Sequence, residues 1–261
     1  MAGTLEIDRP IDGVLRLAIS NPRKRNALDL AILDGIAEAL QSLDGVRCVV
    51  LTGSDGMFSS GYDIGAIPAH LFEVEAEKLV AHPFSSALAA LDEAEVPTLA
   101  ALCGSAIGGG LELALACDLR IASARIDLGM PPAKLGLVYS HTGMRRFLDA
   151  IGEARTRELF LLGRYVDAPT ALSWGLVNWV VPAGELESTA LDLARQLAAN
   201  APLAMAGNKR VLRELLHAEG ALDPDVEREL LALRASSFDS EDLIEGVLAF
   251  TQKRSPSWKG R

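Results

Sequence analysis

The sequence has no excess of positive charge. Its formal net charge is −10, with 35 acidic residues against 25 lysines and arginines. A field of that sign repels phosphate backbones and anionic lipid surfaces. The balance excludes binding to nucleic acid or to a membrane surface through overall charge, and we expect neither as a partner.

Cysteine is scarce and scattered. Cys48, Cys103 and Cys117 form no Cys-x-x-Cys pair, and each lies in an apolar stretch. This pattern indicates reduced thiols inside a cytoplasmic protein, and it argues against a disulfide framework or a zinc site. The histidines have no ligand-like spacing to carboxylates, so we expect no metal and no cofactor of the protein's own.

Long apolar runs are missing as well. Glu112 interrupts the longest one, so no membrane span is expected, and the first residues carry acids without an apolar run, unlike a signal peptide. Aromatic residues make up only 5% of a chain that is 49% hydrophobic. The interior is therefore expected to consist mainly of Leu, Ala, Val and Ile, as in a globular protein with a sizeable core.

Strands and helices alternate in the first half of the chain. Apolar, β-branched runs predict strands at 14–20, 47–53, 96–104, 119–124 and 125–129. Helical periodicity predicts helices at 28–44, 73–94 and 108–118. After about residue 140 the pattern indicates helices alone, at 142–150, 153–162, 168–174, 185–199, 201–217, 224–238 and 240–253. We expect an α/β fold whose C-terminal part is helical.

A cluster of glycines precedes a lone glutamate at residues 104–112, GSAIGGGLE. A buried strand ends there and a helix begins, so backbone N–H groups at the positive end of the helix dipole are free to bind a ligand oxygen. The stretch lacks the third glycine of a dinucleotide fingerprint, the Gly-Lys-Ser/Thr of a P-loop and a Gly-x-Ser-x-Gly elbow. Two interpretations stay open: Glu112 caps the first helical turn, or it faces a ligand cavity.

A second glycine turn, MFSSGYDI at 57–64, follows another buried strand. Taken alone, it is an ordinary surface turn. Two such turns after neighbouring strands can instead aim two N–H groups at one oxygen, an arrangement called an oxyanion hole. The pair of turns favours the catalytic interpretation of Glu112.

Six segments, in order along the chain, resemble the enoyl-CoA hydratase/isomerase, or crotonase, superfamily. They are NPRKRNAL (21–28), FSSGYDI (58–64), GGGLELALACDLRIAS (108–123), LGRYVDAPTALSWGLVNWVV (162–181), NAPLA (200–204) and SEDLIEGVLAFTQKRSPSW (240–258). The resemblance implies a crotonase-like spiral of ββα turns with the acyl-CoA site over 1–198, and an α-helical region for trimerisation and coenzyme A contact over 199–261. It also implies acyl-CoA thioester substrates and assembly into homotrimers or dimers of trimers.

The same resemblance implies roles for individual residues. An enolate on the thioester oxygen would be held by the N–H groups of Ser60 and Gly109, beside the catalytic Glu112. The implied contacts to coenzyme A are Lys24, Arg25, Ala27, Asp63, Ile64, Phe250 and Lys253. Without the resemblance, the charged members of this set would be interpreted as solvated surface residues.

One position departs from the family's hydratases. They use two glutamates to hold and activate water, and the second falls on Pro132, which can neither hold water nor move a proton. PPAKLGLVYS (131–140) resembles a segment of the family's methylmalonyl-CoA decarboxylases, with Tyr139 at their active-site tyrosine but Tyr62 where they have a histidine. His141, beside Tyr139, is interpreted as a turn or surface histidine, and a part in proton transfer stays open. Three functions stay open: a hydratase/isomerase-type enzyme, a malonyl-type (methylmalonyl- or ethylmalonyl-CoA) decarboxylase, and a non-catalytic acyl-CoA binding protein.

Overall fold

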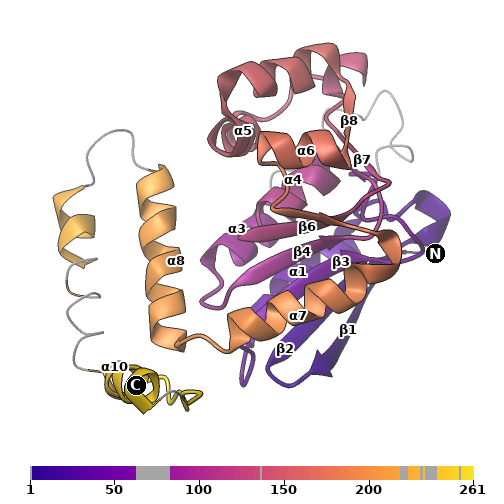
Figure 1. Ribbon diagram of the computed structural model, residues 1–261. Helices are drawn as coiled ribbons and strands as arrows, with labels where there is room; N and C mark the ends of the chain where they lie inside the picture. Colours follow the sequence, from indigo (N-terminus) through magenta and orange to yellow (C-terminus); the bar gives the residue numbers. More distant parts are fainter. Residues whose placement is uncertain are drawn as a thin grey trace.

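The computed structural model describes residues 2–62, 83–135, 137–217, 223–229, 232, 240–252 and 254–261 (Figure 1). The strands are β1 (Thr4–Ile11), β2 (Val14–Ser20), β3 (Cys48–Gly53), β4 (Thr98–Leu102), β5 (Ala106–Ile107), β6 (Leu119–Ser123), β7 (Asp127–Gly129), β8 (Tyr165–Asp167) and β9 (Trp179–Val181). The α-helices are α1 (Leu30–Gln41), α3 (Ser85–Glu93), α4 (Gly109–Leu115), α5 (His141–Leu162), α6 (Ala168–Trp174), α7 (Leu186–Ala198), α8 (Pro202–His217) and α10 (Glu241–Gln252). Short 3-10 helices occupy Pro22–Lys24, Pro132–Leu135 and Ala183–Glu185.

A sheet of six strands, in the order β1-β2-β3-β4-β6-β9, organises the chain. β1 pairs with β2 antiparallel, whereas the later neighbours are parallel to one another. A second sheet has the order β5-β7-β8. Because β3 and β4 are parallel neighbours, the two glycine turns that follow them leave the same edge of the large sheet. This topology brings the two turns together.

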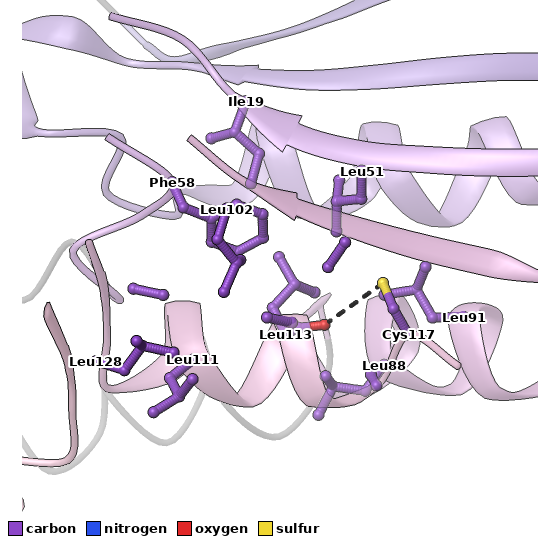
Figure 2. Packing of buried hydrophobic residues seen from close by; sticks show 14 of the residues in the cluster. Ile19, Leu51, Phe58, Leu88, Leu91, Leu102, Leu111, Leu113, Cys117 and Leu128 are labelled. Carbon is purple, nitrogen blue, oxygen red and sulfur yellow. Dashed lines mark hydrogen bonds between the residues drawn. The ribbon is translucent and has the colours of Figure 1, made fainter. Parts of the chain in front are cut away.

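Both faces of the large sheet are apolar, as expected when a mostly parallel sheet is covered on both sides. On one face, Leu51 and Leu102 pack with residues of α1, α3 and α4; Figure 2 shows this packing around Leu113 of α4. On the other face, Val50 and Leu99 pack against α7, which crosses the sheet in Figure 1. We call these the site face and the α7 face.

The start of α1 shows how the sequence sets an element's boundary. The Asp29 carboxylate accepts the N–H of Ile32 at 3.1 Å, which satisfies a free donor of the first turn. Its other oxygen accepts the N–H of Gly3 at 2.6 Å, which ties the helix start to the N-terminal segment. The buried residues of the helix have the spacing of one helical face and are Ile32, Leu33, Ile36 and Leu40.

The predicted bounds of β2 and α6 agree with the structure, but the expectation of helices alone after about residue 140 is wrong. β8 and β9 lie in that region, and each has three residues, too few for a periodic pattern to appear. They form because β7 and β6 offer them hydrogen-bonding edges. β1 and β5 also lie outside the predicted strands.

The helices at 142–150 and 153–162 are joined in α5, with a kink at Gly152, whose φ is 74°. Of the helix expected at 224–238, the described residues 224–229 and 232 are helical. Of the one expected at 73–94, the described part contains α3. The division of the chain at residue 198 stays a prediction.

Candidate active site

In the turn after β3, the backbone N–H groups of residues 59–61 all donate hydrogen bonds within the protein. The N–H of Ser59 donates to the Ser105 carbonyl at 3.2 Å, and that of Gly61 donates to the Ser59 hydroxyl at 3.1 Å. The N–H of Ser60 donates to the Arg25 carbonyl at 3.1 Å. This bond occupies the one N–H that Ser60 has and contradicts its predicted place in an oxyanion hole.

Tyr62 follows these residues and differs from them. Within the ranges that the structure describes, its N–H donates to no other residue. Gly61 uses its carbonyl to accept the N–H of Leu28 at 2.8 Å, so the turn is fixed up to this point. Tyr62, directly after Gly61, therefore has an N–H without a partner among the described residues, whereas that of Ser60 is used.

The glycine triplet 108–110 also contains a backbone N–H group without a partner among the described residues. The N–H of Gly108 donates to the Gly129 carbonyl at 2.9 Å, and those of Leu111 and Glu112 donate to the Gly108 carbonyl at 3.0 and 3.1 Å. The N–H of Gly109, at the first turn of α4, has no acceptor among the described residues. Among the described residues Gly109 thus has an unpaired N–H, and its place in an oxyanion hole stays a prediction.

The two turns are in direct contact. Gly61 has a φ of 91°, and a Cβ added to it would lie 3.1 Å from the Gly109 nitrogen and 2.8 Å from the Ile107 carbonyl oxygen. Only glycine fits there, because the backbone is left-handed and a side chain would meet main-chain atoms. The phenol end of Tyr62 also lies against Gly109, since a Cβ on Gly109 would approach the Tyr62 Cζ at 3.0 Å.

Glu112 is buried one turn into α4, with 2% of its surface exposed. The Tyr139 hydroxyl donates a hydrogen bond to its Oε2. Burial raises the pKa of Glu112, and the hydrogen bond from Tyr139 and the charge of Arg146 oppose that rise. The two side chains predicted to be catalytic, Glu112 and Tyr139, are therefore buried side by side and hydrogen-bonded to each other.

Aromatic rings frame this pair. The Tyr139 ring meets Phe160 edge to face at a centroid distance of 5.5 Å, and Tyr62 meets Phe84 at 4.7 Å. Burial raises the pKa of both tyrosine hydroxyls, and the nearby Glu112 charge raises them further. Both phenols therefore keep their protons at neutral pH and are available as donors.

Pro132 and His141 lie on either side of Tyr139 in sequence. Pro132 is buried at the start of the 3-10 helix Pro132–Leu135 and offers no polar side-chain atom. His141 is exposed at the first position of α5, after the N-cap Ser140, whose hydroxyl accepts the N–H of Gly143 at 3.1 Å. This position fits a surface histidine, in a helix and not in a turn.

The loop predicted to bind coenzyme A, which contains Lys24 and Arg25, is hydrogen-bonded to the turn after β3. Lys24 and Arg25 are exposed, whereas Asn26 is buried with a left-handed φ of 54°. The Asn26 side chain accepts the N–H of Asn21 at 2.8 Å and donates to the Met57 carbonyl at 2.7 Å. These bonds hold the two cations at the rim of the turn that contains Tyr62.

The other predicted coenzyme A contacts are only partly described. Ala27 is 5% exposed. Asp63, Ile64 and Lys253 lie outside the described residues. Phe250 belongs to α10, and only its backbone is described. These assignments stay predictions.

Three features of the site were not predicted from the sequence: Asn26, the N–H of Tyr62, and the ion pair between Arg146 and Asp92. Asn26 stands in a segment interpreted only for its charges, and its left-handed conformation, typical of Asn, is the signal that points to a structural role. The ion pair joins residues 54 positions apart, and no local pattern reveals such a contact.

The described part of the chain has neither a metal site nor a membrane-spanning helix. No cluster of three or more His, Cys, Asp or Glu side chains there could hold a metal ion. No helix there is long and apolar enough to cross a bilayer. The expectation that the protein needs no metal or cofactor stays a prediction.

Known proteins are similar to this chain in sequence and in fold over most of its length. The profile of the family described as enoyl-CoA hydratase/isomerase matches residues 10–261. Two relatives described as carnitinyl-CoA dehydratases, from Salmonella arizonae and Proteus mirabilis, are each 36% identical and aligned over 95% of both chains. An enoyl-CoA hydratase structure from Bacillus anthracis has a TM-score of 0.87 at 28% identity, covering 99% of this chain and 100% of its own. The structure of DspI from Pseudomonas aeruginosa has a TM-score of 0.87 at 32% identity, covering 98% and 97%. This chain therefore belongs to the enoyl-CoA hydratase/isomerase family of lyase- and isomerase-type acyl-CoA enzymes.

Proposed function

We propose that this enzyme forms an enolate on the thioester carbonyl of an acyl-CoA, held by the N–H groups of Tyr62 and Gly109. The observation that carries the proposal is the buried Glu112–Tyr139 hydrogen bond, one helical turn from the Gly109 N–H. Donors aimed at the oxygen where charge develops lower the barrier, and loss of one costs about 2.7–4 kcal/mol. Contact between the turns through Gly61 supports a shared oxygen site.

The reaction that best fits one carboxylate paired with a tyrosine is decarboxylation of a malonyl-type thioester, such as methylmalonyl- or ethylmalonyl-CoA. The bond between Cα and the substrate carboxylate breaks, CO₂ leaves, and the electron pair becomes the thioester enolate. Cα then takes up one proton, which gives the shortened acyl-CoA. No base is needed to start this reaction, so the absence of a polar side chain at Pro132 does not hinder it.

Tyr139 is the proposed donor of that proton. Its pKa is raised mainly by burial, so the phenol stays protonated at neutral pH. The raised pKa of Glu112 suits a group that returns a proton to Tyr139 afterwards, because an acid with a pKa nearer the working pH exchanges protons most readily. Glu112 and Tyr139 thus form one unit for proton delivery.

Dehydration is the second candidate, favoured by the relatives described as carnitinyl-CoA dehydratases at 36% identity. In that direction Glu112 would remove the proton at Cα, and an acid must protonate the leaving hydroxyl. Tyr139 is the remaining acid next to Glu112. A third candidate, acyl-CoA binding without catalysis, predicts that thioesters bind and remain unchanged.

Substrate binding is proposed to use the exposed Lys24 and Arg25 against the phosphates of coenzyme A. Ala27, Asp63, Ile64, Phe250 and Lys253 are proposed to complete the coenzyme A site. No cofactor besides the coenzyme A of the substrate takes part in this scheme. Assembly into homotrimers or dimers of trimers is part of the proposal.

The test is a panel of methylmalonyl-CoA, crotonyl-CoA and a 3-enoyl-CoA, with products identified by mass in D₂O. Decarboxylation predicts loss of CO₂ from methylmalonyl-CoA and one deuterium at Cα. Rapid hydration of crotonyl-CoA instead would establish the second candidate and overturn the importance given to Pro132. Failure of acetoacetyl-CoA to bind at near-millimolar concentration would remove the whole proposal.

Glu112→Gln and Glu38→Gln form a matched pair of variants. Glu38 is exposed on α1, so its substitution should leave turnover unchanged. Glu112→Gln should lower kcat by roughly 10²–10⁴-fold while thioester binding persists, the range expected when a positioned proton-transfer group is lost. Equal turnover in both variants would exclude Glu112 from catalysis.

A further inference from the structure

An ion pair joins helix α5 to helix α3. Arg146 of α5 donates from Nη1 to Oδ1 of Asp92 in α3 at 2.9 Å, and its Nη2 binds Oδ2. The two side chains are 24% and 21% exposed. A bidentate guanidinium–carboxylate contact of this kind is geometrically fixed. Nη1 and Nη2 each donate one hydrogen bond to Asp92, which fixes the plane and position of the guanidinium charge.

Arg146 lies on the side of α5 that faces Glu112. A Cβ added to Gly143, three residues earlier, would lie 2.9 Å from Glu112 Oε1. Residues three apart in a helix share a face. The charge of Arg146 lowers the pKa of Glu112 and that of Asp92 raises it, so both ions act on this carboxyl group. The other titratable groups facing Glu112 within the described ranges are the hydroxyls of Tyr139 and Tyr62.

Helix α8 holds the end of α3, where Asp92 lies. Lys209 donates to the carbonyls of Leu91 at 3.0 Å and Val96 at 3.2 Å, and Arg213, one turn later, donates to the Asp92 carbonyl at 3.3 Å. Such cations satisfy the free carbonyls at a helix C-terminus and suit its dipole. The backbone of Asp92 is therefore anchored, and the ion pair stays beside the site.

We propose that Arg146, held by Asp92, is a positioning residue that acts on Glu112 from the side of α5 that faces it. The two opposite charges partly cancel at Glu112, so the carboxyl group experiences neither a full cation nor a full anion. This role rests on the proposed function of Glu112. Arg146 itself contacts no reacting atom in the scheme.

The proposal predicts opposite effects of removing the two partners. Arg146→Met leaves Asp92 as an uncompensated anion, so the titration of Glu112 should move to higher pH. Asp92→Asn leaves Arg146 as an uncompensated cation, so the titration should move to lower pH. A purely structural ion pair predicts a loss of stability from both changes and no shifts of opposite sign.

The titration is measured by NMR of the full-length protein labelled with ¹³C at the glutamate carboxyl carbons. Loss of one signal in Glu112→Gln assigns Glu112. Arg157→Met is the matched control, because Arg157 also lies on α5 but pairs with Glu153, both 69% exposed. Arg146→Lys retains the charge and should restore most of the wild-type midpoint, which also serves as the folded alternative if Arg146→Met is unstable.

Opposite shifts in the two variants, with no shift in Arg157→Met, are the expected result. Shifts of the same sign, or an unchanged midpoint in both variants, would overturn the proposal. The acid limb of the kcat/KM profile should move in the same directions as the NMR midpoint. Because the NMR titration requires no turnover, an enzyme inactive on every thioester would refute the proposed function and still decide the role of Arg146.

Discussion

The two faces of the large sheet bury apolar side chains alike but treat charge differently. The site face buries Glu112 beside Tyr139, with an ion pair near it. The α7 face packs apolar residues and a cysteine, and its charges stay at the rim, where Arg16 bridges Asp8 and Glu187. Burying a carboxylate costs folding free energy unless partners compensate. Among the described residues, the buried carboxylate of Glu112 lies on the site face, where the proposed function needs it.

Removing a large buried ring from the site face should have the largest effect on stability. Phe147 is 0% exposed, and its ring lies 5.0 Å from that of Phe160, which supports Tyr139. Phe147→Ala should lower the free energy of unfolding by about 3–5 kcal/mol, measured in urea. It should also reduce turnover, because the support of Tyr139 loosens.

Leu186→Ala provides the counterpart on the α7 face, where Leu186 is 5% exposed. We expect a cost of about 2–5 kcal/mol, with the turnover of the folded enzyme unchanged. If Leu186→Ala lowered turnover as much as Phe147→Ala, the two faces would not be functionally distinct.

A methyl group added at Gly143, next to Glu112, should lower both stability and turnover. A Cβ on Gly143 would lie 2.6 Å from Tyr139 Cε1 and 2.9 Å from Glu112 Oε1. Gly143→Ala should cost about 1–3 kcal/mol, as overpacking does, and should abolish most turnover by separating the two catalytic groups. Gly184→Ala is the control, because a Cβ there meets no atom within 4 Å. Thermal unfolding and the thioester assay measure both effects, and full activity in Gly143→Ala would show that this contact is unimportant.

The sequence predicted the fold where the pattern was long and local. β2 and α6 have the expected bounds, and Gly109 lies where a glycine cluster at a helix start indicates a ligand site. Three-residue β8 carries no pattern of its own, since a neighbouring strand determines its conformation. Such short elements can be located only from the tertiary structure, because the neighbouring strand that pairs with them is distant in sequence.

In the candidate site, too, local motifs were predictable from the sequence and distant contacts were not. Glu112 and Tyr139 were predicted from motifs, whereas the choice between the N–H of Ser60 and that of Tyr62 depends on which one the Arg25 carbonyl occupies. That carbonyl belongs to a loop 35 positions before Ser60 in the sequence. The direction of a backbone N–H is set by such a distant partner, and residue type alone does not report it.

Glu112→Gln should make the enzyme more stable at neutral pH. The pKa of Glu112 is raised in the folded state above its ordinary value of 4.5, mainly by burial. Between those two pKa values the folded state binds more protons than the unfolded state, so wild-type stability falls as pH rises through this window. The neutral amide avoids that loss. The stability gained over wild type should therefore grow from pH 4.5 upward, and urea titrations at several pH values measure it.

A gain that shrinks with rising pH would contradict the sign of this shift. Gln is nearly isosteric with Glu, so packing changes little and the pH dependence isolates the charge. No comparable gain is expected from Glu187→Gln on the α7 face, because Glu187 is 74% exposed and its carboxylate remains hydrated.

Removing the exposed ion pairs of Arg16 at the rim of the α7 face should have the smallest effect on stability. Arg16 holds Asp8 at 2.7 Å and Glu187 at 2.6 Å, but these partners are 50% and 74% exposed. Exposed ion pairs gain little because water and salt screen them, so Arg16→Ala should cost less than about 1 kcal/mol. The hydrogen bond from Arg16 lowers the pKa of Asp8, so the contribution of the pair is present at neutral pH and is lost as the pH falls through the acid range. Urea unfolding at low and high salt measures it; a cost as large as that of Phe147→Ala would mean that charge stabilises the α7 face as strongly as packing stabilises the site face.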